Sequence, residues 1–189
     1  VRNIHGLSLA GGANGTLSGC RAEDNEYGYY MSVSSPDISG CEAINNTNSG
    51  FYCQDSHPTM DAVKASGSVY GLCLYGSWPE ICNSTFARNS NGAYAYQSAP
   101  YLADTIFDDN DVGFSSQGYA NGKVITTFTS GKAQEHATFV NGGVRDHISV
   151  TLPSRAIVRQ SNISIRGADM GGDFVIEDKY MQSNPAIYG

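Results

Sequence analysis

Glycine recurs at an almost constant interval along the first 113 residues of the chain. The positions are Gly6, Gly28, Gly50, Gly71, Gly92 and Gly113, and the intervals between them are 22, 22, 21, 21 and 21 residues. A period of this length is typical of a solenoid, in which each repeat forms one coil that stacks on the coil before it. The spacing therefore predicts a rod of about six coils over residues 1–118.

Other residue types recur in phase with the glycines. Proline lies eight residues after four of them, at Pro36, Pro58, Pro79 and Pro100. The third position before glycine holds Asn3, Asn25, Thr47, Ser68, Asn89 and Asn110. Apolar and polar residues alternate within each repeat, which is the period of a β-strand and not of a helix. We expect three short strands per coil: one around the residue six before glycine, one just after glycine and one beginning at proline.

The bends between these strands need residues of suitable backbone conformation. We expect the recurrent glycines to adopt the positive φ of a sharp corner, and the recurrent asparagines to accept a left-handed conformation. Proline is expected to open a strand, where its missing N–H does least harm.

Four columns of apolar residues are expected to point into the coil. Three columns lie one, three and ten residues after glycine, and the fourth, six residues before it, holds Ala22, Ile44, Ala65, Phe86 and Phe107. Large residues alternate between columns. The column one residue after glycine holds Tyr29 and Phe51 in early coils and Ala93 later, where the column six before glycine changes to Phe86. Native packing density requires this kind of compensation.

The repeat Asn-x-x-Gly-apolar-x-apolar, seen at 89–95 and 110–116, resembles that of right-handed parallel β-helix proteins of the pectate-lyase-like type. Among these it resembles the tailspikes and tail fibres of bacteriophages. The resemblance covers residues 1–118 and implies an all-β, right-handed, single-stranded parallel β-helix. Lyases, epimerases and adhesins share such repeats, so the resemblance leaves the activity open.

Residues 119–189 depart from the period. Alternating segments at 123–129, 147–152, 156–159, 162–166 and 173–178 predict a small antiparallel β domain. The resemblance to phage spikes implies that this domain locks three chains into a homotrimer. The alternative is a simple cap over the last coil. Because the first repeat is already under way at Asn3, we also expect the chain to be a fragment of a longer protein.

Charge and composition exclude several partners. The chain has 11 Lys and Arg against 18 Asp and Glu, a net charge of −7 and no basic cluster, so we expect no nucleic-acid partner. No apolar run approaches the length of a membrane span, and no membrane insertion is expected. The five cysteines form no CxxC pair and the four histidines are scattered, so we expect neither a metal site nor a cofactor.

Tyrosine is concentrated two and four residues after glycine, at positions expected to point outwards. Cys73 occupies one of these slots, whereas Cys53 occupies an inward slot. Such a row suits a sugar platform, because each ring offers an apolar face to a pyranose and a hydroxyl for hydrogen bonding. A stabilising ladder or a subunit contact explains it equally. The candidate substrate-binding residues are Tyr52, Tyr75, Trp78, Tyr94, Tyr96 and Tyr101.

A second outward row carries acidic residues. Asp61 and Glu80 are expected on neighbouring coils, offset by one coil and two residues, and thus on the order of 8 Å apart at Cα. That separation suits the acid and the base of an inverting glycosidase. Solvation of an exposed face is the alternative explanation. The candidate catalytic residues are Asp37, Asp61 and Glu80.

The row of outward tyrosines predicts a binding module. The resemblance implies that this module is the distal part of a phage tailspike or tail fibre that recognises bacterial surface polysaccharide as a homotrimer. Such a protein would be assembled in the bacterial cytoplasm with reduced cysteines, and would then be part of the extracellular virion. One alternative is a polysaccharide hydrolase or lyase on the same scaffold. A second is a purely structural stalk with a trimerisation module.

Overall fold

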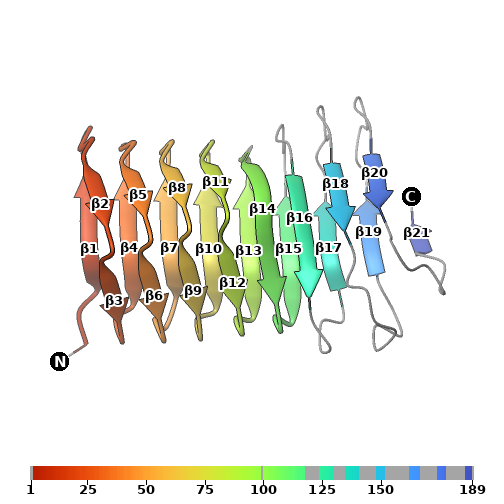
Figure 1. Cartoon of the computed structure of the whole chain (residues 1–189), viewed down its shortest axis with the longest axis horizontal. Coiled ribbons are helices and arrows are strands. Elements are labelled where there is room, and N and C mark those ends of the chain that lie inside the picture. Colours follow the sequence, from red (N-terminus) through yellow and green to blue (C-terminus); the bar gives the residue numbers. More distant parts are fainter. Residues whose placement is uncertain are drawn as a thin grey trace.

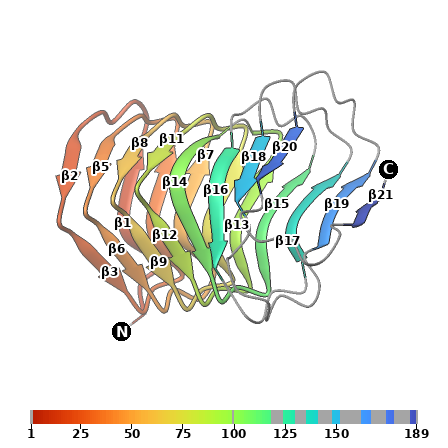
Figure 2. The same ribbon diagram turned by 45° about the vertical axis from the view of Figure 1, so that its right-hand side comes forward.

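The computed structural model describes residues 2–98 and 100–117, together with six later strands between residues 124 and 188 (Figure 1). All elements of these residues are β-strands. The coils follow one another along a single long axis, from the first strand at one end to the last at the other (Figures 1 and 2). The all-β solenoid predicted from the glycine period is confirmed.

Three strands per coil form three columns. The first column is a nine-stranded sheet that contains the periodic glycines, and we call it the glycine sheet: β1 (His5–Ala10), β4 (Tyr27–Ser32), β7 (Ser49–Gln54), β10 (Tyr70–Tyr75), β13 (Asn91–Tyr96), β15 (Val112–Gln117), β17 (Glu135–Val140), β19 (Asn162–Arg166) and β21 (Ala186–Tyr188). Five full turns separate β1 from β15, which agrees with the expected number of coils.

The other two columns belong to one twelve-stranded sheet. The proline limb consists of β2 (Thr16–Ser18), β5 (Asp37–Ser39), β8 (Thr59–Asp61) and β11 (Glu80–Cys82). The alanine limb consists of β3 (Arg21–Glu23), β6 (Glu42–Ile44), β9 (Lys64–Ser66) and β12 (Thr85–Ala87). In the fifth coil a single long strand, β14 (Tyr101–Asp108), pairs with both β11 and β12 and so joins the limbs.

The later strands extend the same columns. β16 (Val124–Thr129), β18 (Ile148–Thr151) and β20 (Phe174–Glu177) continue from β14, and β17, β19 and β21 continue the glycine sheet. All these pairings are parallel. The antiparallel pairing predicted for residues 119–189 is therefore wrong for the described strands. Its basis was the loss of the glycine period, but stacking in parallel needs only alternation and does not need glycine. The segment predicted at 156–159 lies outside the described residues.

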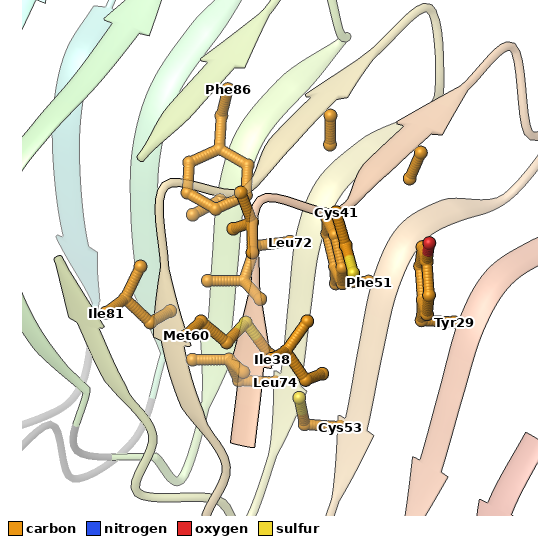
Figure 3. Close-up of a cluster of buried hydrophobic side chains, with 14 of the residues drawn as sticks. Tyr29, Ile38, Cys41, Phe51, Cys53, Met60, Leu72, Leu74, Ile81 and Phe86 are labelled. Carbon is orange, nitrogen blue, oxygen red and sulfur yellow. The ribbon is translucent and has the colours of Figure 1, made fainter. Parts of the chain in front are cut away.

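The core is a file of apolar side chains inside the coils (Figure 3). Tyr29 and Phe51 stack with ring centroids 4.7 Å apart and planes at 10°. Phe86 and Phe107 stack at 5.6 Å in the later coils, where Ala93 replaces a large residue. The predicted shift of bulk between columns is confirmed.

One column slips by a residue. Ala43, and not Ile44, is fully buried and pairs with Ala22 and Ala65. The extra residue of the second 22-residue interval lies between Asn46 and Gly50, so counting back from Gly50 places the column one residue late. For the same reason Asn46, and not Thr47, is the equivalent of Asn25.

The periodic glycines do not form corners. They lie within strands, and no positive φ is found for them in the described chain. A Cβ on Gly71 would lie 2.6 Å from the carbonyl oxygen of Gly92 and 2.8 Å from Nδ2 of Asn89. Gly28 faces the next glycine carbonyl and Asn46 in the same way. From Gly6 to Gly92 glycine recurs because the carbonyl oxygen of the next glycine, together with an inward Asn amide at all of them but Gly50, leaves no room for a methyl group. The prediction that it supplies corner conformation is wrong.

A different set of residues takes the left-handed conformation, one at each of three corners. Before the glycine sheet these are Asp24, Asn45, Gly67, Arg88 and Asp109; after it Val33, Asp55, Gly76 and Gln97; and between the limbs Gly19, Gly40, Ala62, Asn83 and Asp104. Few of these residues are glycine. A non-glycine residue in this conformation is strained, and neighbouring interactions must offset the strain.

At most of these corners the residue after the left-handed position is buried, and its N–H donates to a side chain of the next coil. At the serine corner, which follows the glycine sheet, the N–H of Ser56 donates to Oγ of Ser77 at 3.1 Å, and the N–H of Ser77 donates to Oγ of Ser98 at 3.0 Å. The hydroxyls of Ser56, Ser77 and Ser98 each donate to the carbonyl two residues earlier, as Ser77 does to Tyr75 at 2.8 Å. This ladder satisfies backbone groups that no strand pairs.

Asparagine plays the same part at the asparagine corner, which precedes the glycine sheet. The N–H of Asn25 donates to Oδ1 of Asn46 at 3.0 Å, and that of Asn89 donates to Oδ1 of Asn110 at 2.9 Å. No such bond joins Asn46 to Ser68, and the Ser68 hydroxyl is buried without a partner. The ladder is therefore interrupted at the one described coil in which Ser replaces Asn.

We expect Gly71→Ala to lower the free energy of unfolding by about 1–3 kcal/mol, because the methyl group overlaps backbone and the Asn89 amide. Urea denaturation measures the change. Gly15→Ala is the matched control: a Cβ there meets nothing within 4 Å, and its effect should stay within about 0.5 kcal/mol. Equal effects of the two substitutions would contradict this account of the glycine period.

Ser68→Asn should restore the missing rung of the asparagine ladder and raise the free energy of unfolding by about 1 kcal/mol. The new carbonyl oxygen would accept from Asn46, as Asn46 accepts from Asn25. The same denaturation experiment on Ser90→Asn, at an exposed position next to the ladder, serves as the control and should show little change. A destabilised Ser68→Asn protein would show that the gap is needed for packing.

Candidate functional site

The first part of the glycine sheet is formed by strands without formal charge. Its first six strands, from β1 to β15, contain no Asp, Glu, Lys or Arg at any position. Seven tyrosines with described ring contacts lie on it, and we call this set the tyrosine face: Tyr27, Tyr30, Tyr52, Tyr70, Tyr75, Tyr94 and Tyr96. The parallel register places them over one another, because Tyr30 pairs with Tyr52, and Tyr75 with Tyr96.

Ring contacts run without a break along this face. His5 stacks on Tyr30 at 4.3 Å, and Tyr30 stacks on Tyr52 at 5.1 Å with planes at 6°. Tyr75 then bridges to Tyr52 at 5.8 Å and to Tyr94 at 6.1 Å. Four of the six candidate substrate-binding residues thus share one surface: Tyr52, Tyr75, Tyr94 and Tyr96.

The stacking changes what this surface can offer a ligand. Where Tyr30 and Tyr52 lie parallel, each ring covers a face of the other, and the free parts of the rings are edges and hydroxyls. Tyr75 is tilted by 38° to 62° from its neighbours and is the most exposed tyrosine of the face, at 37%. The face therefore acts as a row of hydroxyl groups, and the expected platform of open ring faces is wrong for the Tyr30–Tyr52 pair.

Cys73 fills a gap in the tyrosine face. It lies between Tyr52 and Tyr94 in the register, in the outward column as expected, yet only 2% of its surface is exposed. Burial raises the pKa of the Cys73 thiol to about 12, and burial also raises the pKa of Tyr52 to about 12. The thiol is thus protonated and covered at neutral pH, which makes it a packing group and not a nucleophile.

The two remaining aromatic candidates lie elsewhere. Trp78 projects from the serine corner between β10 and β11 and is 54% exposed. Its ring lies 4.7 Å from that of His57, one coil earlier, and its backbone N–H donates to Nδ1 of His57 at 3.2 Å. Tyr101 lies on β14, beside Glu80. Sequence reasoning did not single out His57, although it occupies the same slot between Ser and Pro as Trp78.

The acidic candidates lie on the proline limb. Asp37 and Glu80 share a column with Thr59 between them, and Asp61 lies in the next outward column. Asp61 and Glu80 therefore have the expected offset of one coil and two residues. All three side chains are exposed, and Asp61 accepts a hydrogen bond from Nδ2 of Asn83 at 2.8 Å. The three carboxylates thus lie on three successive strands of one exposed surface, β5, β8 and β11.

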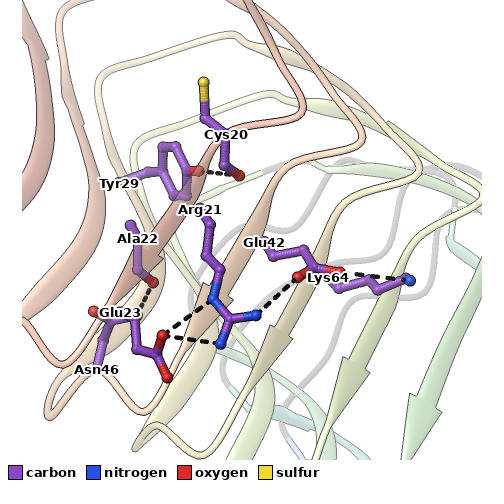
Figure 4. A network of polar contacts seen from close by, with 8 residues as sticks. All are labelled: Cys20, Arg21, Ala22, Glu23, Tyr29, Glu42, Asn46 and Lys64. Carbon is purple, nitrogen blue, oxygen red and sulfur yellow. Dashed lines mark hydrogen bonds and ion pairs between the residues drawn. The ribbon is translucent and has the colours of Figure 1, made fainter.

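Charged pairs gather on the alanine limb (Figure 4). Arg21 contacts Glu23 at 2.9 Å and Glu42 at 3.6 Å, and Lys64 contacts Glu42 at 3.7 Å. Pairs this exposed contribute little stability. Their position matters more, because it leaves the tyrosine face free of charge.

Two cavities lie at the asparagine corner. One of about 550 Å³ is lined by Arg88, Asn89 and Asp109 among others, and one of about 310 Å³ is lined by Arg2, Glu26 and Asn48 among others. Neither includes an aromatic candidate or an acidic candidate. Within the part of the chain that the structure describes, no three His, Cys, Asp or Glu side chains group as metal ligands, and no helix could span a membrane. The five cysteines are free.

Comparison with known proteins supports the fold. A family model described as the right handed beta helix region matches residues 2–78. No curated protein and no solved structure matched the chain. The matched residues cover the first strands of all three columns. The match and the parallel coils together support a right-handed β-helix protein.

Alkaline pH should destabilise the protein through the tyrosine face. The raised pKa of Tyr52, about 12, means that the unfolded chain loses this proton first, so stability is fully present below about pH 10 and falls as pH rises towards 12. Urea denaturation across this range should show the fall, and Tyr52→Phe should reduce its slope. Identical slopes in the two proteins would contradict a role for Tyr52.

Proposed function

We propose that this chain binds bacterial surface polysaccharide through the tyrosine face. The observation that carries the proposal is the row of seven tyrosines on strands without a single formal charge. A neutral, polyhydroxylated ligand gains hydrogen bonds from such a row and does not have to displace ion pairs. A polyanion would find no cation on these strands, and a protein partner bound mainly by ion pairs would find none either.

The scaffold suits this kind of ligand. Strands stacked in register set an interval of about 4.8 Å between backbones along the coil axis, and the tyrosines lie on four successive strands of this stack. Backbone pairing and the inward ladders hold the sheet in place, so binding orders little of the protein. A repeating polymer can then contact the same type of side chain on successive coils.

The binding proposal includes an assembly. We place the chain in a phage tailspike or tail fibre, as a homotrimer exposed on the virion, because the resemblance of its repeats to those proteins implies it. In this assembly the tyrosine face must stay open, and subunits would meet through other surfaces. The mass of the full chain in solution tests this part, and a value near three chains is expected.

Catalysis is the alternative, favoured by the offset of Asp61 and Glu80. Against it, both carboxylates lie exposed on an open strand surface, where water is not excluded from a reacting bond. The neutral tyrosine face does not depend on these residues.

A screen of host envelope polysaccharides for both binding and chain cleavage separates the two functions. We expect binding without cleavage, weakened about tenfold or more by Tyr94→Ala and unchanged by Glu80→Gln. Circular dichroism confirms that each variant is folded. Cleavage that Glu80→Gln abolishes would instead establish the enzyme, and loss of neither activity in Tyr94→Ala would remove the tyrosine face from the site.

A further inference from the structure

We propose that Trp78 is the side chain on which one sugar ring of the ligand stacks, and that His57 positions it. The inference rests on the proposed polysaccharide binding and names the subsite that anchors it. The tyrosine face supplies hydroxyl groups, but its stacked rings supply few open faces. An open aromatic face is what a pyranose needs for apolar contact.

Trp78 offers such a face on rigid backbone. It is 54% exposed although it is a large apolar side chain. The residue before it, Ser77, is fully buried, donates its N–H to Ser98 and donates its hydroxyl to Tyr75. Pro79 follows and restricts the backbone on the other side. An exposed indole on a backbone fixed from both sides is preorganised for contact.

His57, one coil earlier, contacts both the ring and the backbone of Trp78. The centroid of its imidazole lies 4.7 Å from that of the Trp78 ring, with the planes tilted by 47°, so His57 contacts the indole from the preceding coil. The backbone N–H of Trp78 donates to Nδ1 of His57 at 3.2 Å and to the carbonyl of Ser56 at 3.3 Å. In the tautomer that accepts this bond, the imidazole carries its proton on Nε2. No contact of Nε2 is found in the described part of the chain. The Nε2–H is thus a donor available to a sugar hydroxyl.

An acceptor lies on the other side of the corner. A Cβ on Gly76 would lie 2.7 Å from Oδ1 of Asp55, so the Asp55 carboxylate rests against the turn between Tyr75 and Trp78. The open ring belongs to the same short turn that the Asp55 carboxylate contacts at Gly76, and the imidazole follows Asp55 by two residues. Stacking with a donor and an acceptor at its rim is the combination that recognises a neutral sugar ring.

The turn is continuous with the tyrosine face. Trp78 follows Tyr75 by three residues, and Tyr75 is the tyrosine with the greatest exposure. A polysaccharide that crosses Tyr75 and Tyr96 reaches the serine corner at its next ring. Trp78 then anchors that ring, while the tyrosine hydroxyls hold the rest of the chain.

Trp78 is the single tryptophan of the protein, so its fluorescence reports on this subsite directly. The probe is a panel of neutral oligosaccharides cut from bacterial O-antigens and capsules, and calorimetry measures affinity independently. We expect binding to change the Trp78 emission and to shield it from acrylamide. Trp78→Ala should weaken affinity about tenfold or more, and Trp78→Phe should weaken it less.

His57 is tested as a positioning residue. His57→Ala should weaken affinity about threefold to tenfold and raise acrylamide quenching of the free protein, because the indole loses its support. His57→Asn, whose side-chain carbonyl can accept the Trp78 N–H, should recover part of both. Val69→Ala, an exposed apolar residue of the asparagine corner, is the matched control and should bind as the unmodified protein does.

The outcomes separate the two proposals. Calorimetric binding that persists in Trp78→Ala within about twofold, or that leaves Trp78 emission unchanged, would overturn the subsite and leave the tyrosine face standing. Loss of binding in Trp78→Ala together with retention in Val69→Ala supports it. Failure of every oligosaccharide of the panel to bind the unmodified protein would overturn both.

Discussion

Backbone hydrogen bonding between equivalent residues of successive coils is the interaction on which the whole molecule depends. It sets a separation of about 4.8 Å, at which inward side chains must be matched to the coil above and below. The periodic glycines follow from this limit, because the carbonyl of the next glycine and an inward side chain fill the space of a Cβ. The glycine period therefore results from the close approach of successive coils, and not from the conformation of the turns.

The corners show how the same bonding offsets strain. Each coil turns three times through a left-handed residue, including Val33, Ala62 and Arg88, which resist that conformation. At most of these corners the next residue hydrogen-bonds to the following coil, through Ser at one corner and Asn at another. Bonds that recur from coil to coil, with the break at Ser68, let ordinary residues occupy turns that an isolated loop would give to glycine.

The periodicity of the sequence made the fold predictable, whereas local departures from the period could not be placed from the sequence. Alternation and the glycine interval predicted three strands per coil, the core columns and the outward tyrosines. The prediction that Ile44 points inward was wrong, because one inserted residue between Asn46 and Gly50 shifts the inward column to Ala43. The composition of this segment does not show where the extra residue lies. Beyond residue 118 the glycines stop, and alternation alone does not distinguish parallel from antiparallel pairing, which depends on the connections between strands.

The candidate site was predictable as a set of positions but not as an arrangement of rings. Outward positions follow from alternation, so Tyr52, Tyr75, Tyr94 and Tyr96 were found. Ring orientation depends on packing against neighbours, as when Cys73 interrupts the row and Tyr75 tilts to bridge it. The role of His57 depends on a contact one coil away, between residues whose separation in the sequence exceeds any local motif.

Register stacking also limits where such a scaffold can expose an aromatic face. Identical side chains in one column can lie ring on ring, as Tyr30 and Tyr52 do, and this stacking covers the ring faces. At a corner the chain turns away and the column can change residue type from coil to coil, as from His57 to Trp78. In a β-helix that binds a sugar ring, we therefore expect hydroxyl groups on the sheet and the open aromatic ring at a turn.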